Sequence, residues 1–453
     1  MAKNQYTNKE IFEDFPVGKS LRILSVPAII GQLISLVYNL ADTWFVGRLN
    51  NPLMVSATSL AFPIFALSYP VSAIAGTGGG TLISRLLGLH DKDQAKKTAS
   101  FSIYLGFASA LLYALILFLF MDPLLKFLGA SSNNLLYTKQ YLICVSVIGA
   151  VPTILTAVVS NLLRAVGHSK EAAFGTGMGG ILNILLDPLF MFVLLPRDKA
   201  VIGAGLATAL SNTCSLIYLM VIVSKLQNET VLNFSPKNIH PDKKYVKELF
   251  TVGLPAATST LMFDINSMTL NKIMSSYGEI ALAAMGITLK IERLSINICI
   301  GLCMGMTPLV AYNYSAKNID RMRAVVKKTV MTGVIVSIIS IIFYESCAPL
   351  LANAFITDHE TVVLSAAFLR RRAPASGFMF LSFSLVHFFQ GVGSGKHSFW
   401  LPLIRFGCVG IPAIYLMDHF FGMYGIPLAQ LVTDIIIASV SWISYAKFIR
   451  KMK

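Results

Sequence analysis

The sequence predicts an all-α polytopic membrane protein with twelve transmembrane helices in two parallel-repeat six-helix bundles. Composition is the first observation behind this fold class. Of the 453 residues, 55% are hydrophobic and only 13% are charged, whereas soluble domains carry roughly 25% charged residues. The mean hydropathy is +0.68. The other two observations are a series of long apolar runs and a set of motifs that recurs in the two halves.

Each apolar run is long enough for one membrane span, which needs about 20 mostly apolar residues. Short polar segments separate the runs. We predict twelve spans, at residues 23–46, 54–79, 99–121, 137–160, 172–195, 202–224, 248–275, 281–312, 329–354, 363–388, 399–419 and 425–446.

The recurring motifs follow the same order in both halves. VPAIIGQL resembles LPAATSTL, TLISRLLGLHDK aligns with PLVAYNYSAKNI, and LLRAVGHSK resembles FFQGVGSGK. Six spans per half is an even number, so both halves enter the membrane from the same side, as in parallel transporter repeats. We therefore expect an N-terminal bundle at residues 1–225, a cytoplasmic linker at 226–249 and a C-terminal bundle at 250–453.

The formal net charge of +15 is unevenly distributed between the loops. If the N-terminus is cytoplasmic, about 25 Lys and Arg residues fall in the tails and even-numbered loops, against about five in the odd-numbered loops. Positive residues accumulate on the cytoplasmic side of membrane proteins. We therefore expect a multi-pass protein of the cell membrane with both termini in the cytoplasm. The excess charge then reflects topology and contact with membrane lipids, and nucleic acid is not an expected partner.

Motifs for nucleotide, metal or redox chemistry are not supported by their spacing. GTGGGTLISR lacks the GxGxxG pattern, and GVGSGKHS departs from a phosphate loop at Gln390 and His397. The sequence has no HExxH motif and no CxxC pair among its six cysteines. We expect no cofactor, no disulfide framework and no metal beyond a possible Na⁺. Without a nucleotide-binding motif, the expected energy source is an ion gradient or none.

Four polar residues interrupt apolar spans in the N-terminal half. Asn183 and Asp187 are four residues apart and so share one face of a helix, while Asp42 lies on the first span and Thr208 on the sixth. A carboxylate at mid-membrane costs about 2.5–3.5 kcal/mol and usually faces a partner or an ion path. Oxygen groups from separate helices can coordinate a hard cation or hold a proton. Two alternatives stay open: Asp42 pairs with Arg48, or Asn183 and Asp187 only join helices.

The C-terminal half carries charges of both signs within its spans. These residues either form buried ion pairs or make a second proton site or a site for a cationic substrate. They are Asp264, Lys272, Lys290, Glu292, Arg293 and Arg405. Three further arginines, at residues 370–372, lie at the outer end of span ten. Snorkelling toward lipid headgroups accounts for them, and pairing with Asp358 or Glu360 is the alternative.

Several stretches resemble the multidrug and toxic compound extrusion (MATE) family, over nearly the whole chain. They are LPAATSTLM at the start of the second half, GMTPLVAYNYSAKN after span eight, ILNILLDPLF on span five and LLRAVGHSK before it. The branch that the chain is most similar to is that of the MepA-like bacterial exporters. The resemblance implies two six-helix bundles that expel amphipathic, often cationic drugs by antiport with Na⁺ or H⁺ through alternating access.

The resemblance also implies a cation site in the N-terminal bundle. Asp42 and Asp187 match positions that bind Na⁺ or H⁺, and Asn183 and Thr208 match positions that add oxygen ligands. Ala204, one turn before Thr208, matches a position that lends its carbonyl. The connection LPRDKAV before Thr208 is longer here than in close relatives, which makes that residue the least certain match.

Other parts of the resemblance concern conformation and substrate. Pro27 matches a proline linked to bending of the first helix. Tyr38, Asp264 and Glu292 are candidates for lining the substrate cavity. Asp264 lies about one residue from an acidic position of the other branch of the family, and span ten has no acidic residue at depth. The resemblance therefore gives no support to a cation site in the C-terminal half. It implies a monomer.

Two other kinds of function remain open. Lipid-linked oligosaccharide flippases share this superfamily shape and usually have a cationic cavity, which the basic residues of spans seven, eight and eleven could supply. The acidic cluster of the N-terminal half favours antiport instead. A membrane-embedded enzyme would need a nucleophile–base pair or a metal motif, and the sequence offers neither, so we expect that the protein is not an enzyme.

Overall fold

The structure, a computed structural model, describes residues 6–49 and 51–452. In the N-terminal half its helices are η1 (Glu10–Asp14), α1 (Val17–Gly47), α2 (Pro52–Ala66), α3 (Ser68–Gly88), α4 (Lys92–Phe127), α5 (Leu135–Leu142), η2 (Ile143–Ile148), α6 (Ala150–Ala165), α7 (Ser169–Pro188), η3 (Leu189–Leu194), η4 (Arg197–Lys199) and α8 (Ala200–Leu226). In the C-terminal half they are η5 (Pro236–Asn238), α9 (Lys243–Ser275), α10 (Glu279–Ser315), α11 (Ile319–Asn353), α12 (His359–Arg372), α13 (Ala375–Gly391), α14 (Gly395–Pro402), η6 (Leu403–Gly410), α15 (Ile411–Phe421), η7 (Gly422–Tyr424) and α16 (Leu428–Arg450).

Each of the twelve predicted spans corresponds to one helix or to a set of consecutive helices, which confirms the fold class. Five spans are divided into more than one helical element. Breaks are expected only where neighbouring helices shield the freed backbone groups from lipid. The divided spans are α2–α3, α5–η2–α6, α7–η3, α12–α13 and α14–η6–α15.

Hydropathy alone identifies fewer spans than the fold contains. Within the described residues, nine helices are long and apolar enough to cross a membrane, or ten if the bent pair at 135–148 and 150–165 counts as one. The two predicted spans outside this set are α9 and the α12–α13 pair. Helix α9 contains charged and polar residues, which lower its mean hydropathy. Helices α12 and α13 are 14 and 17 residues long, so neither is long enough to cross the membrane alone.

The connection between the halves is shorter than the predicted linker. Helix α8 ends at Leu226 and α9 begins at Lys243, so the last residues of the stretch 226–249 are already helical. Glu248 on this first part of α9 forms an ion pair with Arg85 of α3, with 3.1 Å between Nη1 and Oε2, and Leu249 is fully buried. These contacts pack the first turns of α9 against the rest of the protein, which explains why the helix begins at Lys243, inside the predicted linker. The bounds of the two bundles as units stay a prediction.

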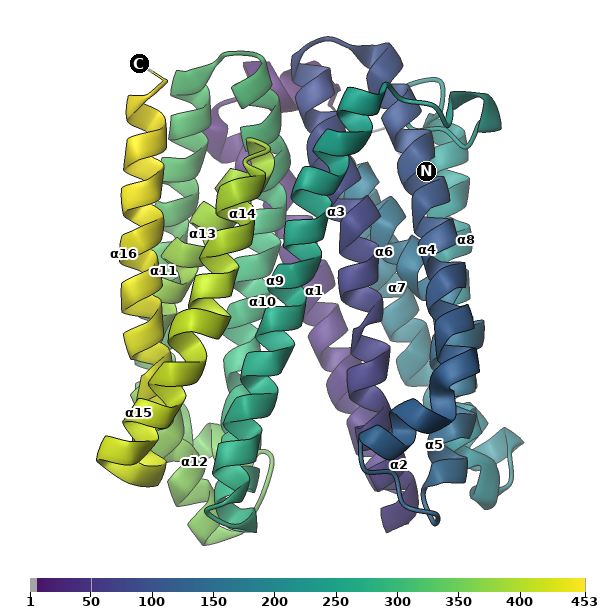
Figure 1. Cartoon of the computed structure of the whole chain (residues 1–453), viewed down its shortest axis with the longest axis vertical. Coiled ribbons are helices and arrows are strands. Elements are labelled where there is room, and N and C mark those ends of the chain that lie inside the picture. Colours follow the sequence, from purple (N-terminus) through teal and green to yellow (C-terminus); the bar gives the residue numbers. More distant parts are fainter. Residues whose placement is uncertain (1–5, 50, 453) are drawn as a thin grey trace.

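The two halves stand side by side and approach each other at one end. In Figure 1 the ribbons of α1–α8 and α9–α16 lie closer at the upper end, where α16 ends, than at the lower end, where α2, α5, α12 and α15 lie. The contacts between halves run mainly from α3 to α9 and from α1 to α10. Small residues allow this approach: Ser25 Oγ of α1 donates to the carbonyl of Leu302 at 3.1 Å, and a Cβ added at Gly301 would lie 2.6 Å from Ile29 Cα.

Gly253→Ala is expected to destabilise the contact between α3 and α9. A Cβ at Gly253 would overlap the backbone carbonyl oxygen of Ile74, and backbone cannot move aside as a flexible side chain can. Overpacking of this kind typically costs about 1–3 kcal/mol. The measurement is the unfolding temperature of the purified protein in detergent. Gly286→Ala is the matched control, because Gly286 lies on α10 with no atom within 4 Å of an added Cβ. Equal unfolding temperatures for the two variants would contradict the role of Gly253.

Candidate cation site

Helix α7 brings its two polar residues close to α1 and α8 because glycines line its faces. A Cβ at Gly179 would overlap Ser215 Oγ of α8, and one at Gly180 would lie 3.0 Å from Tyr38 Cδ1 of α1. The close packing leaves Asn183 3% exposed and Asp187 completely buried. The shared helix face predicted from their spacing therefore points into the protein.

Hydrogen bonds join three of the predicted site residues. Asn183 Nδ2 donates to Asp187 Oδ1 and to Thr208 Oγ1, both at 3.2 Å. Thr208 thus lies beside Asn183 despite the long connection that precedes α8. Ala204 is fully buried one turn earlier on the same helix.

Asp42 of α1 lies within electrostatic range of Asp187, and both interact with Tyr141 of α5. Tyr38, one turn before Asp42, interacts with Asp42. Asp42 does not pair with Arg48, the alternative predicted for it. The Arg48 guanidinium lies over the ring of Trp44, 4.7 Å from its centroid. The carboxylate of Asp42 forms no ion pair within the described ranges.

Three acceptor oxygens of this cluster are buried without a hydrogen-bond partner among the described residues. They are Asp42 Oδ1, Asn183 Oδ1 and Asp187 Oδ2. Burying an ionised carboxylate without compensation is costly, and a bound cation or proton supplies that compensation. Carboxylate, amide and hydroxyl oxygens are the ligands that hard cations prefer. Within the described residues, no group of three or more His, Cys, Asp or Glu side chains suits a metal ion.

Helix α1 continues without interruption through Pro27, from Val17 to Gly47. A bending role for Pro27 stays a prediction. Tyr141 is a neighbour of the site that the sequence did not reveal. It is 9% exposed, but a tyrosine within a span carries no spacing signal that distinguishes it from those facing lipid.

The charged residues of the C-terminal half form two buried ion pairs. Arg372 Nη2 of α12 lies 2.7 Å from Glu292 Oε2 of α10, and Arg405 Nη2 of η6 lies 2.7 Å from Asp434 Oδ1 of α16. All four side chains are at most 6% exposed. Gln430 connects the pairs, since its Nε2 donates to Asp434 at 2.6 Å and its Oε1 accepts from Arg372 at 3.4 Å.

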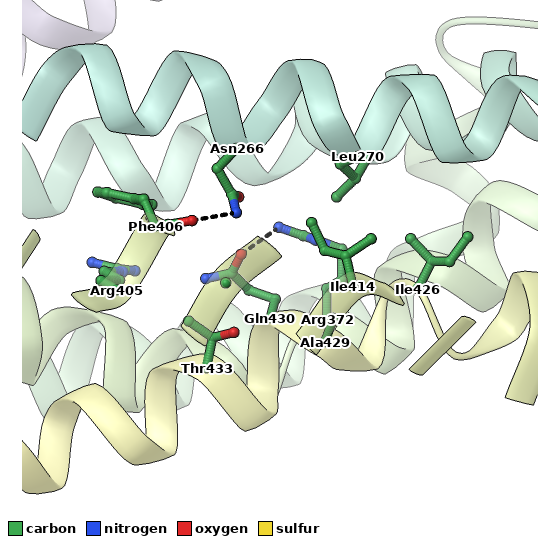
Figure 2. A pocket seen from close by; sticks show the side chains of 11 residues that line it. Asn266, Leu270, Arg372, Arg405, Phe406, Ile414, Ile426, Ala429, Gln430 and Thr433 are labelled. Atoms are coloured by element: carbon green, nitrogen blue, oxygen red, sulfur yellow. Dashed lines mark hydrogen bonds between the residues drawn. The ribbon is translucent and has the colours of Figure 1, made fainter. Parts of the chain in front are cut away.

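Figure 2 shows the cavity that lies between these pairs, with Arg372 directed toward Gln430 and Asn266 donating to the carbonyl of Phe406 at 3.2 Å. The guanidinium of Arg405 also lies over the ring of Phe383, 4.4 Å from its centroid. Opposite charges thus compensate each other within this cluster. Buried ion pairs are the first of the alternatives predicted for the C-terminal half, and Glu292 and Arg405 form them.

Glu292 is buried and pairs with Arg372, and its role in lining a substrate cavity stays a prediction. Residues 370–372 do not share one environment: Arg370 pairs with Glu345 at 3.9 Å, Arg371 lies over Tyr424, and only Arg372 is buried. Among the ion pairs of the described residues, none joins these arginines to Asp358 or Glu360. Asp358 caps α12 by accepting from the backbone N–H of Thr361.

Of the other charged residues predicted in the spans of this half, Lys272, Lys290 and Arg293 are exposed, and Asp264 is half-buried. Asp264 interacts electrostatically with Arg293, whose guanidinium lies 5.1 Å from the ring centroid of Phe263. Tyr69 of α3 lies within electrostatic range of both Asp264 and Arg293. Tyr69 also interacts with Tyr38 of α1. Tyr69 thus has electrostatic neighbours in both halves, Tyr38 in one and Asp264 in the other.

The fold defines a multi-pass membrane protein built from two six-helix repeats. The chain belongs to the MATE family, as its motifs indicated. The MatE family model matches it twice, at residues 27–189 and 255–416. These two segments begin at Pro27 and Pro255, in agreement with the internal repeat.

Relatives cover nearly the whole chain. It is 31% identical over 423 residues to the multidrug export protein MepA of Staphylococcus aureus, which covers 93% of this chain and 92% of that protein. It is 30% identical over 427 residues to MepA of Staphylococcus haemolyticus, covering 94% and 93%. A solved structure, the outward-facing conformation of a multidrug resistance MATE family transporter of the MOP superfamily, has the same fold. The TM-score is 0.93 at 23% identity, and the match covers 100% of this chain and 99% of that one.

Arg372→Met is expected to destabilise the protein strongly, because it leaves the buried Glu292 without its counter-charge. Removing one partner of a buried pair costs about 3–5 kcal/mol. The measurement is the unfolding temperature in detergent. Arg370→Met is the matched control, since its pair with Glu345 is nearly half exposed and exposed pairs contribute about 0–1 kcal/mol.

The double substitution Arg372→Met with Glu292→Leu separates loss of charge balance from loss of packing. It removes both charges together, so it is expected to recover most of the stability that the single substitution loses. A double variant no more stable than Arg372→Met would contradict this account of the pair.

Proposed function

We propose that the protein is a secondary active exporter that expels amphipathic, cationic compounds in exchange for Na⁺ or H⁺. The observation that carries the proposal is the set of three buried acceptor oxygens without a partner, on Asp42, Asn183 and Asp187. The relatives are named multidrug export proteins, which supports the same direction and substrate class for this chain. Asp42 and Asp187 would hold the coupling ion, and the oxygens of Asn183, Thr208 and Ala204 would complete its environment.

Coupling would pass through helix α1, which carries Asp42 and also packs against α10 of the other half. Binding a cation between Asp42 and Asp187 removes their mutual repulsion and draws α1 toward α7. The contact of Ser25 with Leu302 lies on the same helix, so the movement changes how the halves meet. A ligand shifts such an equilibrium only by its differential affinity for the two states. In the proposed mechanism, the two states would differ in affinity because they place different numbers of oxygens in contact with the ion.

The conformation described here would be the outward-facing one. The loops at the end where the halves meet carry most of the Lys and Arg residues, which supports a cytoplasmic location for that end and for both termini. The same fold occurs in a structure named as outward-facing. In this orientation the region between Tyr69 and Asp264 faces the exterior. It offers aromatic surface and a carboxylate to an amphipathic cation, in a monomer surrounded by lipid.

Asp187→Asn is expected to abolish gradient-driven efflux while the protein still folds. Asparagine keeps the size and a hydrogen-bonding group but cannot carry the charge or the proton. Losing a charged ligand corresponds to about a tenfold or greater loss of ion affinity. The measurement is efflux of a fluorescent cationic drug from proteoliposomes, with Na⁺ and pH gradients imposed separately.

Asp122→Asn is the matched control for this experiment. Asp122 is a half-exposed carboxylate of the same half, paired with Lys139, and its loss should leave efflux unchanged. Normal efflux by Asp187→Asn under both gradients would rule out the proposed site. If wild type gave no efflux under either gradient but moved a lipid-linked oligosaccharide, the flippase alternative would replace antiport.

Thr208→Val should distinguish the two coupling ions. Valine keeps the shape of threonine and removes the hydroxyl oxygen, which can bind Na⁺ but is not needed to hold a proton on a carboxylate. If Na⁺ is the coupling ion, the Na⁺ concentration for half-maximal efflux should rise about fivefold, the effect of about one neutral hydrogen bond. If H⁺ is the coupling ion, efflux driven by pH should stay near wild type. If the protein couples to Na⁺ and Thr208→Val leaves the Na⁺ concentration for half-maximal efflux unchanged, Thr208 is not part of the site.

A further inference from the structure

Residues 8–14, at the N-terminus, pack between the two halves at the end where these meet. The segment is polar overall, yet Ile11 and Phe12 are 1% and 0% exposed. Thr7 and Glu10 form a reciprocal cap at its start: Thr7 N donates to Glu10 Oε2 at 2.6 Å, and Glu10 N donates to Thr7 Oγ1 at 3.3 Å. The backbone N–H and the hydroxyl of Thr7 hold the pKa of Glu10 below its usual range. The segment is therefore an ordered element whose apolar side chains are both covered.

The segment binds the C-terminal half through α10 and α11. The ring of Phe12 stacks on that of Tyr312, with centroids 5.0 Å apart and planes 17° from parallel, and the hydroxyl of Tyr312 donates to Glu13 Oε1. The carbonyl of Phe12 accepts from Arg321 Nε at 2.8 Å and from Asn313 Nδ2 at 3.3 Å. We call this set of interactions the Tyr312 contact.

The same segment also touches the N-terminal half, at the turn between α6 and α7. Gly167 in this turn has φ +86°, and a Cβ there would lie 3.1 Å from Asn8 Oδ1, 3.5 Å from Ile11 and 3.6 Å from Phe12. The turn thus requires glycine both for its backbone conformation and for the close approach of the segment. Residues 8–14 are held on both sides of the interface between the halves.

A second contact lies at the repeat-equivalent position of the other half. In the aligned motifs TLISRLLGLHDK and PLVAYNYSAKNI, Arg85 corresponds to Tyr312. Arg85 pairs across the interface with Glu248, which lies at the start of the first span of its own half. We call this pair the Arg85 contact.

The turns beside the two contacts are also equivalent. Gly393 corresponds to Gly167 in the aligned motifs FFQGVGSGK and LLRAVGHSK. Its φ is +77°, and a Cβ there would overlap the guanidinium of Arg85. Each half thus sends a carboxylate, Glu13 just before α1 or Glu248 in the first turns of α9, to an equivalent residue of the other half.

We propose that the Tyr312 contact and the Arg85 contact form a pseudo-symmetric gate that holds the termini-bearing end closed, with residues 8–14 as its removable part. The inference rests on the proposed alternating access, because a closed end matters only if it must open. Opening at this end separates Tyr312 from Glu13 and Arg85 from Glu248 and withdraws Phe12 from between the halves. The interactions are direct and local, so weakening them shifts the equilibrium toward the state open at this end.

The test measures the distance between the halves and not transport. Spin labels at Lys170→Cys on α7 and Ala324→Cys on α11, both exposed in the structure, report the separation at this end in the full chain with its native cysteines replaced. Phe12→Ala combined with Tyr312→Phe removes the stacking and the hydrogen bond of the Tyr312 contact. The population with the longer distance is expected to rise about tenfold in the absence of drug and ion gradients.

Lys19→Ala is the matched control, because Lys19 lies over the rings of Tyr6 and Phe15 and these contacts stay within the N-terminal region. It should leave the distance distribution unchanged. Arg85→Gln should raise the longer-distance population as well, and combining it with the Tyr312-contact variant should multiply the two increases if the contacts act independently on one equilibrium.

Unchanged distances in the Tyr312-contact variant would overturn the gate. This outcome is distinguishable from failure of the exporter proposal. If the distances shift but no variant and no wild-type protein transports drug, the gate stands and the exporter proposal fails. If wild type and variant both transport under a gradient and the distances do not change, the exporter proposal stands and the gate fails.

Discussion

The absence of water in the hydrocarbon core of the bilayer is the constraint on which the polar structure of this protein depends. Every polar group at that depth must find its partner within the protein. The C-terminal half balances its buried charges internally, because Arg372 and Arg405 each face a carboxylate and Gln430 joins the two pairs. The N-terminal half does not, because Asp42 and Asp187 face each other and an amide. One repeat neutralises these buried charges internally, whereas Asp42 and Asp187 of the other form no ion pair among the described residues.

Close helix packing is what makes both arrangements possible. Lipid tails are as apolar as leucine, so helices in a bilayer associate through contact and hydrogen bonding. The glycines of α7 bring Asp187 against α1 and α8, and Gly301 on α10 lets α1 approach. Helix α1 packs against α7 on one side and against α10 on the other. In the proposed exporter, a change at Asp42 would therefore be transmitted through α1 to the interface between the halves.

The sequence predicted the fold and the N-terminal cluster more completely than the C-terminal cluster, and the reason is separation along the chain. Asn183 and Asp187 are four residues apart, so helical geometry alone brings them together. Glu292 and Arg372 are 80 residues apart in sequence and meet only through packing of α10 against α12. Asp434 was missed because its partner Arg405 lies in a different span, on a π-helical segment whose position no hydrophobic pattern marks. The sequence also shows no sign that η1 is packed, because its buried Phe12 lies in a mostly polar stretch near the N-terminus.

In the two repeats, contacts between the halves occur at equivalent positions but are made by different kinds of side chain. Arg85 and Tyr312 are equivalent, and each meets a carboxylate from the opposite half, but one does so as an ion pair and the other through a phenol hydroxyl and a stacked ring. The glycine turns beside them keep the same left-handed backbone. The proposed gate needs only an attractive contact of the right size at each position, whereas the proposed ion site needs particular oxygens. This difference accounts for contacts of the gate in both halves, while the carboxylates of Asp42 and Asp187 have no counterpart among the neutralised pairs of the C-terminal half.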